Sequence, residues 1–256
     1  MSSPRTEWVY GLHTVNALLA RYPERVVRVC LQQGRADAKA EQIEHLARAA
    51  GKPLERIDPA RLLARLGEVV HQGVAAEVQA LVPWREAELL SAIELNRNPL
   101  LLALDGVQDP HNLGACLRTA DACGALAVIV PRDRAAPLNA TARKIASGAA
   151  ETTPVVTVTN LARTLTLLKD AGLWIVGADA AGAQAAAEVD LTGPRVLVLG
   201  GEGRGLRALT RRQCDWLARL PSEGAVESLN VSVAAGMLLY EALRQRAAAA
   251  PQPPGP

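Results

Sequence analysis

Three short segments in the second half of the chain combine polar side chains with glycines. The first, from Asp109 to Thr119, contains Asn112, Gly114 and Arg118. An amide and a guanidinium at this spacing are able to hold a polar or anionic ligand, and the glycine between them leaves open surface. The structural alternative is that Asn112 caps a helix and that Arg118 pairs with Asp121, three residues later. Spacing alone leaves both interpretations open.

The second segment, Leu199–Leu206, reads Leu-Gly-Gly-Glu-Gly-Arg-Gly-Leu and includes Glu202. This glycine density allows the main chain to approach a ligand closely and to adopt positive φ angles. The spacing Gly201-x-Gly203-x-Gly205 is close to a dinucleotide-binding pattern. That pattern, however, opens the first βαβ unit and is followed by an acidic residue about 20 positions later. Because the segment lies near the end of the chain, a nicotinamide-dependent dehydrogenase is disfavoured.

The third segment, Leu220–Asn230, leads into an apolar stretch with helical periodicity. Its structural interpretation is that Ser228 caps the last helix. Its functional interpretation uses the same geometry, because the unbonded N–H groups at a helix start bind polar or anionic ligand groups. Both interpretations place this segment at the beginning of a helix.

Cysteine and histidine spacing does not support metal or nucleophilic chemistry. The four cysteines include no Cys-x-x-Cys pair, and no His is placed to complete a zinc-finger pattern. Cys116 and Cys123 lie seven residues apart on an expected helix, so both are predicted to face the core. No His-Glu-x-x-His run, paired-carboxylate spacing or Ser-His-Asp arrangement is recognisable. We therefore predict neither a metal site nor a disulfide.

Composition places these segments in a globular protein of one large or two modest domains. The chain has 256 residues and 27.0 kDa, with 49% apolar and 21% charged residues. Aromatic residues make up 3%, with no Phe, which disfavours an aromatic base-stacking surface. The net charge of +2 decides nothing about nucleic-acid partners. The apolar runs are too short to span a bilayer and the first residues lack an export signal, so a cytoplasmic location is expected.

The elements that must position the three segments follow from hydrophobic periodicity. From Pro99 onward, short apolar strands alternate with helices, which predicts an α/β fold with a parallel sheet covered on both faces. The expected strands are 100–104, 125–130, 155–158, 174–177 and 196–199, and the expected helices include 138–146, 161–168 and 229–247. Loops at the carboxyl ends of parallel strands meet at one edge of the sheet, so the three segments are expected to form one composite site.

The first part of the chain has its own alternation. Its expected strands are 26–31 and 74–81, and its expected helices are 10–19, 38–50 and 58–66, the last with Asp58 as N-cap and Pro59 at the first helical position. Residues 83–98 form a charged, helix-prone connector, and the proline-rich end is predicted to be disordered. We therefore divide the chain into an N-terminal domain (1–82), a linker (83–98), a second domain (99–248) and a tail (249–256).

Taken together, the three segments resemble the motifs of the SpoU/TrmH branch of the SPOUT RNA methyltransferases. The matching residues are Asn112-x-Gly114-x-x-x-Arg118, Gly200-Gly201-Glu202-Gly203 and Ser228-Leu229-Asn230. Within that branch, further stretches are similar to the bacterial 23S rRNA guanosine-2′-O-methyltransferases that modify the peptidyl-transferase P loop. These stretches are Tyr10–His13, His71–Val74, Asp105–Gly114 and Leu138–Thr141. One motif alone is weak, whereas three in order, together with the N-terminal stretches, are specific.

This resemblance implies a fold and partners that the pattern of elements does not. The second domain is implied to be a SPOUT-type parallel sheet with a deep trefoil knot, which binds S-adenosylmethionine. The N-terminal domain is implied to be a small α/β RNA-binding domain similar to a ribosomal-protein fold. A homodimer through the knot domain and 23S rRNA as substrate are implied as well, with neither DNA nor a membrane as partner.

The resemblance also implies a site for methyl transfer to a ribose 2′-hydroxyl. No metal is needed, because the sulfonium is already a good leaving group; the enzyme must align donor and acceptor and help remove the hydroxyl proton. The residues implied to line the catalytic pocket are Asn112, Arg118, Glu202, Ser228 and Asn230. The residues implied to hold the methyl donor are Gly200, Gly201, Leu220 and Leu229.

Two other functions stay open at this point. A tRNA ribose 2′-O-methyltransferase of the same branch is disfavoured, because those enzymes lack a domain like the one that spans Tyr10 to Val74 here. A non-catalytic rRNA-binding assembly factor is disfavoured because all five polar motif residues are present. Methyl transfer itself distinguishes an enzyme from an assembly factor.

Overall fold

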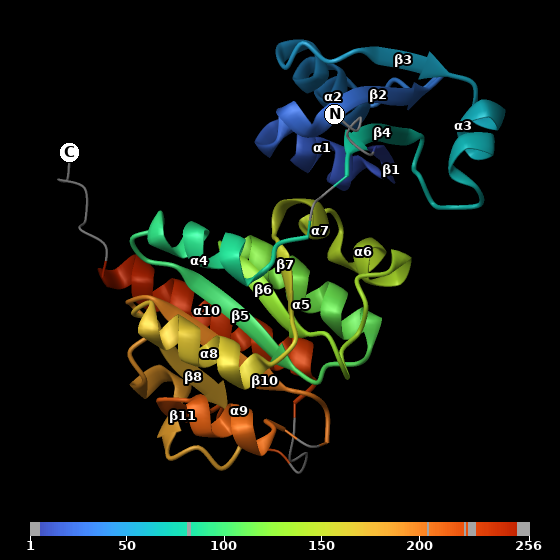
Figure 1. The fold of residues 1–256 in the computed structure, drawn as a ribbon. Helices are drawn as coiled ribbons and strands as arrows, with labels where there is room; N and C mark the ends of the chain where they lie inside the picture. Colours follow the sequence, from blue (N-terminus) through green and yellow to red (C-terminus); the bar gives the residue numbers. More distant parts are fainter. Residues whose placement is uncertain (1–5, 81–82, 204, 223, 225–228, 250–256) are drawn as a thin grey trace. The chain divides into compact units, whose positions relative to one another are not determined.

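The computed structural model divides the chain into two compact units (Figure 1). Unit 1 comprises Met1–Val82 with Ser147–Thr152, and unit 2 comprises Pro83–Ala146 with Thr153–Pro256. The structure describes residues 6–80, 83–203, 205–222, 224 and 229–249. The predicted tail, 249–256, therefore lies outside the described residues except for Ala249. Among the helices of the described part, none has the length and apolarity that a bilayer span requires.

Unit 1 is built on a four-stranded sheet with the order β1-β4-β2-β3. β4 is antiparallel to both β1 and β2, and β3 is parallel to β2. The strands are β1 (Thr6–Tyr10), β2 (Val26–Gln32), β3 (Leu54–Ile57) and β4 (Val74–Gln79). The α-helices are α1 (Leu12–Arg21), α2 (Ala38–Ala49), α3 (Pro59–Leu66) and the short α7 (Ala149–Thr152). β1 and β3 were not expected from periodicity, because each is short and carries polar residues.

Local signals explain how the unit 1 helices begin. The carboxylate of Asp58 accepts a hydrogen bond from the Ala60 N–H at 2.8 Å, and Pro59 occupies the first position of α3, as predicted. α1 and α2 contribute Val15, Leu18 and Ile43 to a core on one face of the sheet. α3 contributes Leu62 to a smaller cluster on the opposite face. The sheet of unit 1 is thus covered on both faces.

Unit 2 is built on a seven-stranded sheet with the order β7-β6-β5-β10-β8-β11-β9. Each neighbouring pair is parallel, which confirms the predicted fold class. The strands are β5 (Leu100–Asp105), β6 (Ala127–Pro131), β7 (Val155–Val158), β8 (Trp174–Ala178), β9 (Gln184–Ala185), β10 (Arg195–Gly200) and β11 (Trp216–Arg219). β9 and β11 were not expected, since both are short; β9 is the edge strand, and β11 lies between it and β8. The trefoil knot stays a prediction.

The helices of unit 2 lie on both faces of this sheet. They are α4 (Glu86–Glu94), α5 (Pro110–Ala122), α6 (Ala140–Ala146), α8 (Leu161–Asp170), α9 (Ala208–Gln213) and α10 (Val231–Ala249). α4 and α8 pack one apolar cluster onto β5, β6, β7, β8 and β10. α5 and α10 lie on the other face, against each other (Figure 1). α4 falls within 83–98, so the segment expected as a connector contributes Leu89 and Ile93 to the core of unit 2.

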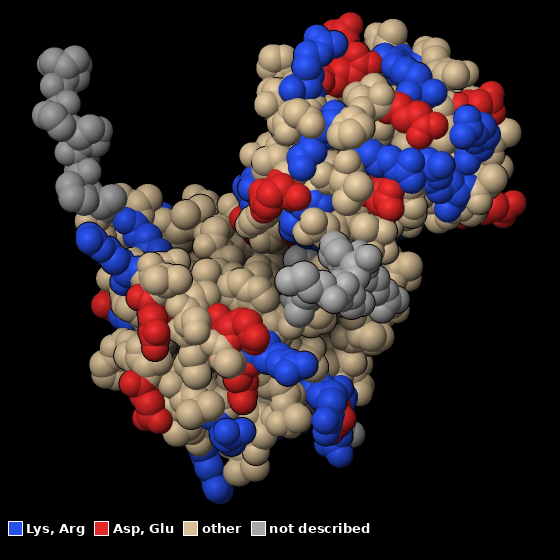
Figure 2. Space-filling model, turned by 45° about the horizontal axis from the view of Figure 1, so that its top comes forward, with Lys and Arg blue, Asp and Glu red and all other residues tan. Residues whose placement is uncertain are grey.

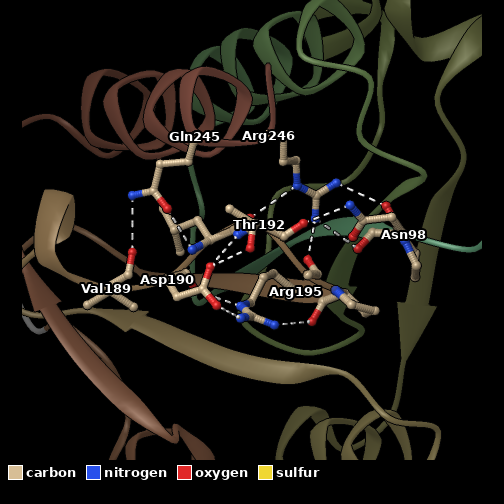
Figure 3. A network of polar contacts seen from close by, with 11 residues as sticks. Asn98, Val189, Asp190, Thr192, Arg195, Gln245 and Arg246 are labelled. Carbon is tan, nitrogen blue, oxygen red and sulfur yellow. Dashed lines mark hydrogen bonds and ion pairs between the residues drawn. The ribbon is translucent and has the colours of Figure 1, made fainter. Parts of the chain in front are cut away.

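The C-terminal part of α10 is fastened to the amino edge of the sheet by a polar network (Figure 3). The guanidinium of Arg246 donates hydrogen bonds to four main-chain carbonyls, those of Asn98, Pro99, Leu191 and Gly193. Gln245 exchanges hydrogen bonds with the main chain of Val189 and Leu191. Because α10 begins next to the third sequence segment, this network fixes the far end of a helix whose near end reaches the candidate site.

Candidate functional site

Three side chains from separate sequence segments form one hydrogen-bonded cluster at the carboxyl edge of the unit 2 sheet. Asn112 Nδ2 donates to Glu202 Oε1 at 2.9 Å, and Asn230 Nδ2 donates to the same oxygen at 3.0 Å. Asn230 Nδ2 also donates to Asn112 Oδ1 at 3.0 Å. The predicted composite site is therefore present for these three residues, and we call them the Asn–Glu–Asn cluster.

The start of α5 positions Asn112. Asp109 is the N-cap, with its carboxylate accepting a hydrogen bond from the His111 N–H at 2.9 Å, and Pro110 is the first helical residue. The interpretation of Asn112 as a helix cap is therefore wrong. Asn112 lies in the first turn and is only 7% exposed, and its amide is used for Glu202 and Asn230. Because this amide is buried and both its nitrogen and its oxygen are hydrogen-bonded, the side chain of Asn112 is held in one orientation.

Asn230 combines a structural and a site contact. Its Oδ1 accepts hydrogen bonds from the N–H and the hydroxyl of Ser232, at 2.8 and 2.6 Å, so Asn230 caps α10. Its Nδ2 points to the other two members of the cluster. The last helix thus begins at Val231, two residues later than predicted. Ser228, the other predicted residue of this motif, lies outside the described residues.

The glycine segment after β10 approaches its neighbours too closely for side chains. A Cβ on Gly200 would lie 2.0 Å from the carbonyl carbon of Gly205, and one on Gly201 would lie 2.3 Å from the Gly106 carbonyl oxygen. Gly203 and Gly205 adopt positive φ angles of 76° and 60°. The segment consequently folds back on itself and presents main-chain atoms rather than side chains. The predicted positive φ angles are confirmed, and the close approach seen here is to the chain's own main chain; the approach to a ligand stays a prediction.

A buried carboxylate that sequence reasoning missed holds this segment in place. The carbonyl of Asp105 accepts the Gly201 N–H at 2.9 Å. The carboxylate of Asp105, fully buried, accepts the Arg207 N–H at 2.9 Å and pairs with the Arg207 guanidinium. The signal that could have revealed it is a charged residue at the end of an otherwise apolar strand, where only a paired charge is tolerated.

A cavity of about 650 Å³ opens beside the cluster. Its wall includes Glu202 and all four residues predicted to hold the methyl donor, Gly200, Gly201, Leu220 and Leu229. The last residue of β8, Ala178, and the two residues after it form another part of the wall. Glu202 belongs to both features, so the Asn–Glu–Asn cluster adjoins this cavity through Glu202.

Arg118 lies on α5, the helix that also carries Asn112. It lies six residues after Asn112, so its side chain leaves the helix about 120° around the axis from Asn112. Arg118 is exposed, whereas the stripe Leu113, Cys116 and Leu117 is buried as predicted. Gly114 does not leave open surface: a Cβ there would lie 2.5 Å from the Ala142 carbonyl oxygen, because α6 packs against this position.

The cysteines of α5 differ in their surroundings. Cys116 is buried, and burial raises the pKa of its thiol to about 12, which keeps it neutral near pH 7. Cys123 is half-buried at the end of the helix, so the prediction that both face the core is correct for Cys116 alone. Within the described ranges, no three His, Cys, Asp or Glu side chains are grouped as a metal site would need.

Fold and site together define an α/β protein with a ligand cavity at the carboxyl edge of a parallel sheet, walled by a glycine segment. The sequence model of the SpoU rRNA Methylase family matches residues 99–240, and that of RNA 2′-O ribose methyltransferase substrate binding matches residues 8–84. The chain belongs to the SpoU rRNA Methylase family.

Similar proteins cover nearly all of the chain. The 23S rRNA (guanosine-2′-O-)-methyltransferase RlmB of Pseudomonas aeruginosa is 54% identical, over 94% of this chain and 97% of its own. RlmB of Haemophilus influenzae is 47% identical, over 94% and 98%. The SpoU methyltransferase AviRb from Streptomyces viridochromogenes, solved in complex with the cofactor AdoMet, is 28% identical with a TM-score of 0.71, over 94% and 91%. The A. aeolicus TrmH/SpoU tRNA modifying enzyme is 32% identical with a TM-score of 0.55, over 64% and 83%.

Proposed function

We propose that this protein transfers a methyl group from S-adenosylmethionine to the ribose 2′-hydroxyl of a guanosine in 23S rRNA. The observation that carries the proposal is the Asn–Glu–Asn cluster at the wall of a glycine-lined cavity. It is supported by relatives of this name that are about half identical over nearly the whole chain. Such a substrate places the reaction in the cytoplasm.

The cavity suits S-adenosylmethionine as the methyl donor. Gly200 and Gly201 leave no space for side chains, so the main chain itself forms the wall against which a ligand lies. Gly200, Gly201, Leu220 and Leu229 hold the donor through main-chain groups, with Leu229 and Leu220 adding apolar surface. When bound, S-adenosylmethionine supplies an electrophilic methyl on a sulfonium, a good leaving group. The chain's task is then alignment and removal of the hydroxyl proton.

Glu202 is oriented for the acceptor side of the reaction. Both asparagines donate to Oε1, which fixes the carboxylate plane. Oε2 accepts no hydrogen bond from the residues that the structure describes, so it is available for the ribose hydroxyl of the target. Asn112 and Asn230 act as positioning residues through Glu202, and Ser228 belongs to the same motif.

Arg118 acts on the substrate rather than as a general base. A guanidinium with a pKa above 12 stays protonated near pH 7 and cannot take up the hydroxyl proton. A bidentate contact to the phosphate next to the target would position the nucleotide and favour the developing alkoxide. The exposed position of Arg118 is compatible with contact to RNA.

Unit 1 binds the RNA substrate. The match of residues 8–84 to a substrate-binding model supports this role for an N-terminal domain of about 1–82. The tRNA modifying enzyme matches 64% of this chain, whereas RlmB relatives match 94%, and this difference favours 23S rRNA over tRNA. On the face drawn in Figure 2, basic and acidic side chains are interspersed, so this face does not form one broad basic patch.

We further propose that the protein is a homodimer through unit 2. α10 is apolar on two opposite sides: Leu238 and Leu239 are buried, whereas Val233, Met237 and Tyr240 are between 43% and 63% exposed. These exposed residues are spaced by four and three positions and share one side of the helix. A second copy of the chain, packed against this side of α10, would remove these large apolar side chains from water.

The dimer is tested by light scattering after size-exclusion chromatography. Tyr240→Glu is expected to give monomers, because it places a charge in the interface. Leu63→Glu, at a similarly exposed apolar position of unit 1, is the control and is expected to stay dimeric. A wild-type protein that elutes as a monomer at all concentrations contradicts this part of the proposal.

The reaction is tested by incubating the protein with radiolabelled S-adenosylmethionine and protein-free 23S rRNA, followed by nuclease mapping of labelled ribose. A single labelled guanosine is the expected result. Label on tRNA alone would move the protein to the sister activity. Donor binding without transfer to either RNA would point to an assembling particle as substrate, and absence of donor binding would favour the assembly factor.

A further inference from the structure

Unit 2 contains a second cavity that the methyl-transfer site does not use. Its volume is about 320 Å³, and it lies between the carboxyl ends of β6 and β7 and the starts of α8 and α9. Consecutive residues separate the two cavities: Leu206 lines the first, and Arg207 lines the second. A ligand in the second cavity therefore lies next to the segment that carries Glu202.

Arg207 is held in a fixed orientation at this cavity. Asp105, whose side chain has no exposure, accepts hydrogen bonds from the Arg207 N–H and from Nε, and also pairs with Nη2. The Arg207 side chain is 41% exposed and forms part of the cavity wall. The buried carboxylate of Asp105 holds one edge of the Arg207 guanidinium, and the other edge can bind a ligand. Because the side chain is already ordered, it loses little rotamer entropy when a ligand binds.

The rest of the lining combines one carboxylate with apolar surface. Asp133 lies at the rim, with a side chain that is 77% exposed and 3.7 Å from the guanidinium of Arg132. Leu161 and Leu209 provide apolar walls. Because Arg207 is paired with Asp105 and Asp133 with Arg132, the four charges cancel, which favours a neutral ligand that has both donors and acceptors over a phosphate.

We propose that this cavity binds a guanine base from an unpaired position of the RNA, an inference that rests on the proposed function. Guanine presents two adjacent acceptors, O6 and N7, which suit an arginine, and two adjacent donors, N1–H and N2–H, which suit a carboxylate. Adenine, cytosine and uracil lack one of these paired edges. Apolar walls on either side suit the flat faces of a base that is splayed out of a loop.

The test is a double-mutant cycle that combines a substitution of Asp133 with removal of the N2 amino group of one guanine. Fluorescence anisotropy measures the Kd of the full-length protein for transcripts that together cover 23S rRNA, and the transcript bound most tightly is used for the cycle. Inosine, which lacks the N2 amino group, replaces each unpaired guanosine in turn. At one position the replacement is expected to raise the Kd about tenfold for the wild type, the order of one bidentate base contact.

Asp133→Asn supplies the other side of the cycle. It is expected to raise the Kd for the unmodified RNA about tenfold, and to be insensitive to inosine at that position. 7-Deazaguanosine there removes N7, the acceptor for Arg207, and is expected to weaken binding to wild type and Asp133→Asn alike. Asp170→Asn, an exposed carboxylate at the other end of α8, is the control and leaves the Kd unchanged.

The inference would be overturned if, at every guanosine position, the inosine replacement and Asp133→Asn raised the Kd by factors that simply multiply in the combination. A Kd for the unmodified RNA that Asp133→Asn leaves unchanged would overturn it as well. These results are distinct from failure of the proposed function, which shows itself as absence of methyl transfer by the wild type. Anisotropy reads the cavity whether or not the methyl group is transferred.

Discussion

Asn112 and Asn230 lie 118 residues apart in the chain and share a hydrogen bond, from Asn230 Nδ2 to Asn112 Oδ1 at 3.0 Å. Both also donate to Oε1 of Glu202. Because Asn230 caps α10 with its other amide atom, this bond fixes the starts of α5 and α10 to each other and to the glycine segment. The three elements that form the site therefore cannot shift independently.

Asn230→Asp distinguishes the two roles of Asn230, capping α10 and donating a hydrogen bond to Glu202. Its carboxylate still accepts the Ser232 N–H at the start of α10, but it cannot donate to Glu202 and places two like charges together. We expect turnover to fall at least tenfold, while the free energy of unfolding falls less than in Asn230→Ala. The alanine variant also loses the cap and is expected to cost about 1 kcal/mol. Initial rates and urea unfolding measure the two effects, and an active Asn230→Asp enzyme would contradict the role assigned to the amide.

Gly200→Ala tests the main-chain wall of the donor cavity. The added Cβ meets the main chain of Gly205 at 2.0 Å, so the glycine segment must move. We expect the Kd for S-adenosylmethionine to rise at least tenfold by isothermal titration calorimetry. Gly236→Ala in α10 is the control, because among the described residues its Cβ meets only Thr119 Cγ2, at an ordinary 3.7 Å. The control is expected to bind the donor normally; equal losses in both variants would argue against a specific role for Gly200.

Arg118→Lys tests whether the role of Arg118 depends on the planar shape of its guanidinium or only on its positive charge. Lysine keeps the positive charge but cannot present a planar fork to a phosphate. We expect kcat to fall at least tenfold, with no change in the Kd for S-adenosylmethionine. Steady-state kinetics on 23S rRNA and calorimetry with the donor alone check the two expectations. Near-full turnover in the lysine variant would show that charge suffices and would refute the bidentate role.

Much of unit 2 was predictable from sequence because its strands are continuous apolar runs bounded by helices. The composite site followed from the same logic, since strand ends in a parallel sheet converge. Short strands such as β9 and β11 were not predictable, because their pairing depends on neighbours distant in sequence rather than on their own pattern. The role of Asn112 was ambiguous for a related reason: only the fold shows that Asp109 takes the cap and frees the amide for Glu202.

Cys116 should resist thiol reagents in the folded protein. Burial raises the pKa of its thiol to about 12, so almost none is thiolate at pH 8, and the side chain is inaccessible. Half-buried Cys123, whose pKa burial also raises, is expected to react sooner. Mass spectrometry of peptides after timed treatment with iodoacetamide distinguishes the two sites. Raising the pH from 7 to 9 should increase labelling at Cys123 before Cys116, and the opposite order would contradict the burial of Cys116.

Arg246→Met is expected to lower the free energy of unfolding by about 2–3 kcal/mol, the cost of leaving several partly buried carbonyls without donors. The Arg246 guanidinium serves four carbonyls, and burial, together with the charge of Arg195, lowers its pKa. Arg244→Met, two residues earlier on α10, is the control. Arg244 is exposed and, among the residues that the structure describes, its guanidinium is bonded to Glu241 alone, so its loss should cost less than about 0.5 kcal/mol. Urea unfolding measures both, and similar values for the two variants would show that the network contributes no more than a surface ion pair.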